Sequence, residues 1–288
     1  MNAKLLKNFN FSFLVEGNTI FFRYFSTILL LLFALLIGGC EKFTSKTVAQ
    51  MCSEEPDICN DLNPDAWCRA EKADIIKHRY QQAEPPTHAQ QYQLILFFED
   101  YQDCISKAAQ IRHKQLREKE TGRMKGLLTA QNELKRLAYE TRNIDDPYLS
   151  YYQWSRHGHD DALARFLRFE RNGELNTAPL QVGLASYHAK RDTGKAINAL
   201  YTALSLYTEE EAIDPEIFTS LYTLHQQRGE SEMAVVFALI AKEYDKNDVD
   251  LATLQRLASD AGLDFDYLQK RAGSIHGAIE AREFSFSS

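Results

Sequence analysis

Five cysteine thiols carry the most reactive side-chain chemistry in this 288-residue chain. One of them, Cys40, directly follows an apolar run over residues 28–37 and the small residues Gly38 and Gly39. The run is too short to cross a bilayer as a helix. Its length, with three basic residues upstream and small residues after it, is typical of the core of an export signal. The sequence therefore predicts that residues 1–39 are a signal peptide.

The segment Ile37-Gly38-Gly39-Cys40 resembles the lipobox of bacterial lipoproteins. The resemblance implies that the peptide bond before Cys40 is cleaved and that Cys40 then carries the lipid that anchors the protein in a membrane. The next residue is Glu41 rather than an aspartate, which resembles the pattern of lipoproteins sent to the outer membrane. We therefore expect a protein of the bacterial cell envelope, lipid-anchored at the outer membrane and facing the periplasm.

The four other cysteines form an even set, which in an exported chain predicts disulfides. The midpoint between Cys68 and Cys104 falls on a Pro85-Pro86 turn that must break a helix, so in an antiparallel hairpin the two thiols lie at the same height. This favours a Cys68–Cys104 disulfide and leaves Cys52 to pair with Cys59. A zinc site of four thiolates is disfavoured because the Cys-x-x-Cys spacing that it needs is absent from the sequence.

The segment His157-Gly158-His159-Asp160-Asp161 is the one compact cluster of possible metal ligands in the sequence. Its imidazoles and carboxylates could hold a zinc ion that activates water, as in a metal-dependent hydrolase of cell-wall or lipid material. The competing interpretation is structural: a turn at the glycine, followed by an aspartate that caps or begins the next helix. We favour this second interpretation, because no further histidine stands at helical spacing from the pair.

Other catalytic motifs are missing from the sequence, namely a nucleophile elbow, an HExxH helix and a phosphate-binding glycine loop. The formal net charge of −7 disfavours nucleic acid as a partner. We therefore expect a binding protein without a cofactor rather than an enzyme.

Four aromatic residues in one short segment are the candidate protein-binding surface. At helical spacing Tyr148 and Tyr152 share one face, while Tyr151 and Trp154 share another. One face must pack in the core, and the other could line a groove for a peptide. Core packing of both faces is the alternative.

The stretch 112–142 is locally basic, with nine lysine or arginine residues against four glutamates. One interpretation is a solvated helix face with pairs four residues apart, such as Arg136 with Glu140. The other is a contact with anionic lipid headgroups or with an acidic partner.

Helical periodicity extends through most of the chain after residue 60, and signals for strands are weak. Asn63-Pro64-Asp65 predicts a helix start, and Pro85-Pro86 a break, so the first helix is expected over 64–81. A second amphipathic helix is expected to follow over about 94–111, and a third over 124–139.

Three later segments, 149–169, 184–207 and 221–244, align as helix pairs. The small residues that open their second helices, Ala162, Ala196 and Ala234, are 34 and then 38 residues apart. The series resembles a degenerate tetratricopeptide array, with residues near Gly262 beginning a capping pair. Such repeats stack, and each buries a face that it cannot bury alone.

The mature chain also resembles an uncharacterised family of bacterial lipoproteins known only as a domain of unknown function. The resemblance rests on the lipobox, the cysteine-bearing hairpin and the Tyr-Leu-Ser-Tyr-Tyr-Gln-Trp segment at 148–154. The expected fold is all-α: signal peptide (1–39), tether with a short disulfide loop (40–60), long-helix hairpin region (61–145) and a tetratricopeptide-like solenoid of about three helix pairs (146–288). The expected function is a protein-interaction scaffold or assembly factor of the envelope, with the hydrolase and the headgroup binder as alternatives.

Overall fold

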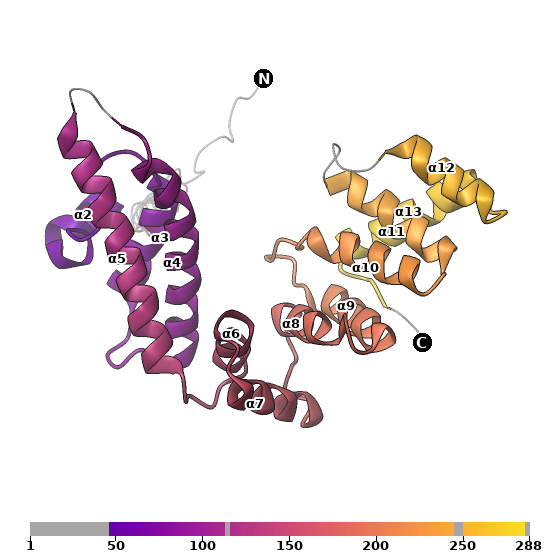
Figure 1. The fold of residues 1–288 in the computed structure, drawn as a ribbon, viewed down its shortest axis with the longest axis horizontal. Helices are drawn as coiled ribbons and strands as arrows, with labels where there is room; N and C mark the ends of the chain where they lie inside the picture. The colour runs from indigo at the N-terminus through magenta and orange to yellow at the C-terminus, as the bar shows by residue number, and fades with distance from the viewer. Residues whose placement is uncertain (1–45, 113–115, 245–249, 286–288) are drawn as a thin grey trace, which may run out of the picture. The chain divides into compact units, whose positions relative to one another are not determined.

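The computed structural model describes residues 46–112, 116–244 and 250–285, and these residues form helices and turns without strands (Figure 1). The all-α prediction is confirmed. Within these ranges no helix is long and apolar enough to span a bilayer. The predicted signal peptide and Cys40 lie outside the described residues.

The chain divides into two compact units, residues 1–56 and 57–288. In the first unit the described residues form α2 (Val48–Glu54), where the sequence predicted a tether. Thr47 caps this helix, because its hydroxyl accepts from the backbone N–H of Gln50 while the Gln50 side chain accepts from the backbone N–H of Thr47. A short 3-10 helix, η1 (Pro56–Ile58), follows.

The second unit begins with three helices, α3 (Arg69–Gln81), α4 (His88–Ala109) and α5 (Arg117–Thr141). The break at the two prolines is present, since α3 ends before them and α4 begins after them. Thr87 and Gln90 form the same type of capping box at the start of α4. The third helix is longer at both ends than the predicted range 124–139.

The predicted helix start at Pro64 is wrong, because Asn63 and Asp65 bind other helices instead of capping α3. The Asn63 side chain is buried, and its Oδ1 accepts a hydrogen bond of 2.8 Å from the hydroxyl of Tyr101 on α4. Asp65 accepts a hydrogen bond of 2.7 Å from Nε of Arg123 on α5. Residues 64–68 therefore form turns, and α3 begins only at Arg69.

Two glycines let α5 approach this loop closely. A Cβ on Gly122 would lie 2.7 Å from the ring of Pro64. A Cβ on Gly126 would clash with the hydroxyl of Tyr101 and would lie 3.1 Å from the backbone nitrogen of Asn63. Both positions therefore require a residue without a side chain.

In the described part of the chain after α5, eight helices follow in four successive pairs, and short turns join the two members of each pair (Figure 1). Left-handed glycines with φ near 70° end the first helix of three of the pairs at Gly158, Gly229 and Gly262. The bounds of the pairs are α6 (Pro147–His157) with α7 (Asp160–Arg171), α8 (Ala178–His188) with α9 (Thr193–Leu206), α10 (Glu216–Gln227) with α11 (Ser231–Tyr244), and α12 (Leu251–Asp260) with α13 (Phe265–Glu280).

The small residues used to align the repeats are buried in the structure. Ala162, Ala196 and Ala234 each lie in the first turn of a second helix and are at most 4% exposed. One hydrophobic core runs beneath the pairs from Phe166 to Phe284. The predicted segments 149–169, 184–207 and 221–244 each overlap one of the first three pairs, although the second and third begin inside α8 and α10.

A buried polar cluster joins the second and third pairs. The hydroxyl of Tyr201 on α9 lies 2.7 Å from Nε2 of His225 on α10, whose Nδ1 lies 2.6 Å from Glu230. A neutral imidazole that accepts from the tyrosine and donates to the glutamate satisfies both contacts. Burial lowers the pKa of His225, although Glu230 opposes this change, so the neutral form is favoured.

The close approach at Gly126 predicts a specific loss of stability. We expect Gly126→Ala to lower the free energy of unfolding by about 1–3 kcal/mol, because the methyl group overpacks the contact with Tyr101. Gly277→Ala is the matched control in α13, where an added Cβ meets no atom within 4 Å. It should raise the free energy of unfolding by about 0.5–1 kcal/mol. Urea unfolding of the full chain measures both, and equal stability of the two variants would contradict this packing argument.

Candidate functional site

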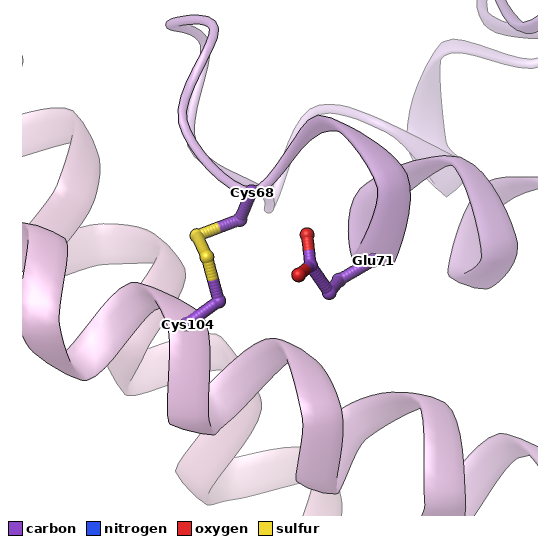
Figure 2. A group of neighbouring side chains, drawn as sticks. All are labelled: Cys68, Glu71 and Cys104. Atoms are coloured by element: carbon purple, nitrogen blue, oxygen red, sulfur yellow. A yellow bond between two sulfur atoms is a disulfide. The ribbon is translucent and has the colours of Figure 1, made fainter. Parts of the chain in front are cut away.

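Cys68 and Cys104 form the predicted disulfide, with their Cα atoms 5.8 Å apart (Figure 2). Cys68 precedes α3 in a left-handed backbone conformation with φ of 55°, and Cys104 lies within α4. The bond therefore joins the beginning of one hairpin helix to the second half of the other. Cys52 and Cys59 are disulfide-bonded as well.

Glu71 points toward this disulfide from the first turn of α3 (Figure 2). One of its oxygens and the two sulfurs lie within 4.8 Å of one another. In the part of the chain that the structure describes, this is the only cluster of three or more possible metal ligands. Its two sulfurs are bonded to each other, so neither is a thiolate that could bind a metal.

His157 and His159 belong to no such cluster. His157 is the last residue of α6 and His159 precedes α7, with their rings stacked 6.0 Å apart. Burial is the main cause that lowers the pKa of His157, and the neighbouring His159 lowers it further. Asp160 and Asp161 occupy the first turn of α7, where Asp161 pairs with Arg165 at 3.0 Å. The geometry favours the structural interpretation of this segment.

The candidate aromatic surface is mostly packed. The ring of Tyr148 packs at a tilt against that of Tyr92 of α4, with the centroids 5.0 Å apart, and its hydroxyl lies 2.6 Å from that of Thr177. Tyr152 is only 4% exposed. Tyr148 and Tyr152 thus provide a packed face of α6, as the sequence required of one of its two aromatic faces, and they fix α6 against its neighbours.

The other face of α6 packs on the second helix pair. The ring of Tyr151 contacts Phe166, and a Cβ on Gly183 of α8 would lie 2.8 Å from that ring. Trp154 is half-buried, with its ring 5.6 Å from that of Tyr187 on α8. Trp154, like Tyr148 and Tyr151, therefore combines packing with partial solvent contact.

An open cavity of about 780 Å³ lies where α4, α5 and α6 meet. Tyr152 and His157, both singled out from the sequence, are part of its wall. A bidentate ion pair crosses it, with Arg156 Nε 2.9 Å and Nη2 3.3 Å from the oxygens of Glu99. The other lining residues are Asp100, Gln102 and Asp103 of α4 and Leu134, Lys135 and Ala138 of α5.

Negative charge is concentrated on one wall of the cavity. Burial, together with the neighbouring carboxylates of Glu99 and Asp103, raises the pKa of Asp100. Burial also raises the pKa of Tyr152 to about 12, so its phenol stays protonated at neutral pH. Ion pairing with Glu99 raises the pKa of Arg156. The α4 wall thus carries excess negative charge that a cationic group could neutralise.

Sequence reasoning missed this acidic wall. Glu99, Asp100 and Asp103 stand in the sequence, but the periodic signal of this helix is its apolar stripe, which lies on the opposite side. A search for acids on the polar face of α4 would have found them. Their position opposite Arg156 depends on how α6 packs on α4, which the sequence pattern does not encode.

Two arginines of the basic stretch are held in ion pairs. Arg123 is 2% exposed and is paired with Asp65, while Arg136 is held by Glu133 at 2.7 Å and by Glu140 at 2.6 Å. The predicted Arg136–Glu140 pair is therefore confirmed. Lys114 lies outside the described residues.

These features define an all-helical protein with a disulfide-stapled hairpin followed by helix pairs. The chain belongs to a family described as protein of unknown function (DUF2989), whose sequence profile matches residues 37–239. No curated protein and no solved structure matches the chain.

The disulfide predicts a large stabilisation of the hairpin. We expect the double variant Cys68→Ser, Cys104→Ser to lower the free energy of unfolding by about 3–4 kcal/mol, because the unfolded chain gains the freedom of an uncrosslinked loop. The bridge closes a sequence separation of 36 residues. Urea unfolding followed by circular dichroism measures the change. A loss below about 1 kcal/mol would contradict the chain-entropy estimate.

Proposed function

We propose that this chain is a bacterial lipoprotein, anchored through lipid on Cys40 at the outer membrane, that binds another envelope protein through its helical surface. The anchor is inferred from the sequence that precedes the described residues. Two observations support it: the family match begins at residue 37 and so includes Cys40, and the later cysteines are disulfide-bonded, as is typical of exported proteins. Its role would be that of a scaffold or assembly factor.

The observation that carries the proposal of protein binding is the series of four helix pairs over one continuous core. Stacked helix pairs that resemble tetratricopeptide repeats present an extended surface, and such surfaces commonly bind peptides or proteins. The buried Ala162, Ala196 and Ala234 support this interpretation, because small residues allow the paired helices to approach closely.

The cavity between α4, α5 and α6 is the candidate contact point. It combines apolar wall atoms from Leu134 and Ala138 with the acidic side chains of Asp100 and Asp103. A lysine or arginine of the partner would be attracted to these carboxylates, and its aliphatic stem would cover the apolar part of the wall. We therefore expect the partner to contribute a basic segment.

The anchor has a direct test in bacterial cells. The full chain should incorporate a labelled fatty acid, and its mature N-terminus should begin at Cys40. Cys40→Ser should abolish the label and release the protein from the membrane fraction, whereas Cys52→Ser, made together with Cys59→Ser, should leave the label in place. Persistence of the label in Cys40→Ser would refute the anchor.

Protein binding can be tested by site-specific photo-crosslinking in intact cells. A photoreactive amino acid at His157, on the wall of the cavity, should capture a specific envelope protein. The same group at Tyr267, which is 54% exposed on α13, serves as the control position. Asp100→Asn with Asp103→Asn should weaken the capture at least several-fold, while Glu209→Gln with Glu210→Gln, the same charge change in an exposed loop, should not. Identical products from both positions would contradict a contact at this cavity.

A further inference from the structure

The outer face of α5 exposes large apolar side chains. Met124, Leu128 and Tyr139 are 45%, 52% and 83% exposed, respectively. At about 100° per residue they lie within roughly 60° of one another around the helix axis. They therefore form one solvent-facing stripe, on the side away from the Gly122 and Gly126 contacts.

Cations lie on the same face. Arg117, Lys135 and the C-capping Arg142 fall within the same sector of about 60°. All three are exposed, and no ion pair is found for them among the described residues. We call the set Arg117, Met124, Leu128, Lys135, Tyr139 and Arg142 the α5 stripe.

Three of the four cations elsewhere on α5 are bound to other groups. Arg123 and Arg136 have carboxylate partners, and Lys125 donates to the backbone carbonyl of Asn60 at 2.6 Å. Lys135 also lies on the wall of the cavity that contains Asp100 and Asp103. Glu120, on the neighbouring side of the helix, lies 3.5 Å from Arg112. Lys119, for which no ion pair is found among the described residues either, lies on the other side of the helix. Three of the four cations of α5 that have neither a carboxylate nor a backbone carbonyl as partner thus lie beside its exposed apolar residues.

Further apolar exposure continues at the N-terminal end of the helix. Ile111 and Leu116 are 37% and 40% exposed. A shallow hollow of about 520 Å³ adjoins the stripe, with Ala109, Met124 and Leu128 among its lining residues. The apolar surface around the N-terminal end of α5 is therefore large enough that its exposure to water is unfavourable.

We propose that the α5 stripe lies on the surface of an anionic lipid bilayer, with Met124, Leu128 and Tyr139 inserted at the headgroup boundary and the three cations on lipid phosphates. A helix with apolar side chains flanked by lysine and arginine binds membranes in this way. The inference deepens the proposed function, because lipid on Cys40 would hold the stripe near a bilayer and a second contact would orient the protein on it.

A lipid surface fits this face better than an acidic protein does. The stripe is the convex side of a single helix, which suits a planar boundary, whereas protein hot spots are typically buried in complementary pockets. A tyrosine that is 83% exposed is also placed as aromatic residues are at membrane interfaces, with an apolar ring and a hydroxyl at headgroup level. Binding by an acidic protein is then one of the outcomes of the test.

The test uses the full chain reconstituted in vesicles of phosphatidylethanolamine and phosphatidylglycerol that carry bromine on their acyl chains. Tyr139→Trp introduces a fluorescent probe on the stripe, and Tyr267→Trp is the control. The emission of Trp67 and Trp154 is measured in the unsubstituted chain and subtracted from that of each variant. We expect bromolipid to quench the probe at 139 and not the probe at 267. Quenching should be lost in phosphatidylcholine vesicles and in the variant Arg117→Glu, Lys135→Glu. It should persist in Lys190→Glu, Lys195→Glu, which changes the same charge elsewhere.

Flotation of the same samples separates this inference from the anchor. Protein that floats with the vesicles while the probe at 139 is not quenched overturns the inference and leaves the anchor intact. Protein that lacks lipid but is still quenched at 139 supports the inference and refutes the anchor. Quenching that is equal in neutral vesicles, or that disappears only when an acidic protein is added as a competitor, overturns the electrostatic contact with lipid.

Discussion

The hairpin depends on the burial of one positive charge. Arg123 is almost completely buried, and a buried guanidinium without a carboxylate would cost several kcal/mol, so Asp65 must lie beside it. Burial alone would raise the pKa of Asp65, but hydrogen bonds from Arg123, Asn63 and the backbone of Trp67 lower it overall. Holding Asp65 there keeps residues 64–68 out of the helix and places Cys68 opposite Cys104. The close helix contacts at Gly122 and Gly126 follow from the same arrangement.

This constraint explains where sequence reasoning succeeded and where it failed in the hairpin. The disulfide could be predicted, because the thiol positions and the proline break are local features. The helix start could not, because Asn63-Pro64-Asp65 is a good capping sequence whose side chains are bound by residues 38 and 58 positions away. The preference of these residues for a helix N-cap is worth about 1 kcal/mol, which is less than the cost of leaving the buried Arg123 without its carboxylate.

The helix pairs and the candidate site show the same contrast between local features, which the sequence reveals, and distant contacts, which it does not. Ala162, Ala196 and Ala234 mark the pairs because a small buried residue recurs in the first turn of each second helix, and this spacing can be read from the sequence. For the aromatic segment at 148–154 the sequence left two interpretations open, because periodicity gives the faces of a helix but not the number of neighbours that cover them. Tyr152 and His157 were singled out from the sequence, but the acids opposite them come from α4, and only the packing of α6 against that helix forms the cavity.

The Cys68–Cys104 bridge also affects the order in which the molecule can be assembled. Both cysteines and both helices that they join lie in the first part of the chain, before any of the four helix pairs. In a chain that emerges N-terminus first, this covalent ring can close while the pairs α6 to α13 have still to follow. Tyr92 and Glu99 of α4 would then already be in place to contact Tyr148 and Arg156 of α6, so the first pair would pack on a preformed surface. The bridge thus makes the hairpin a template for the rest of the molecule as well as a stabilised part of it.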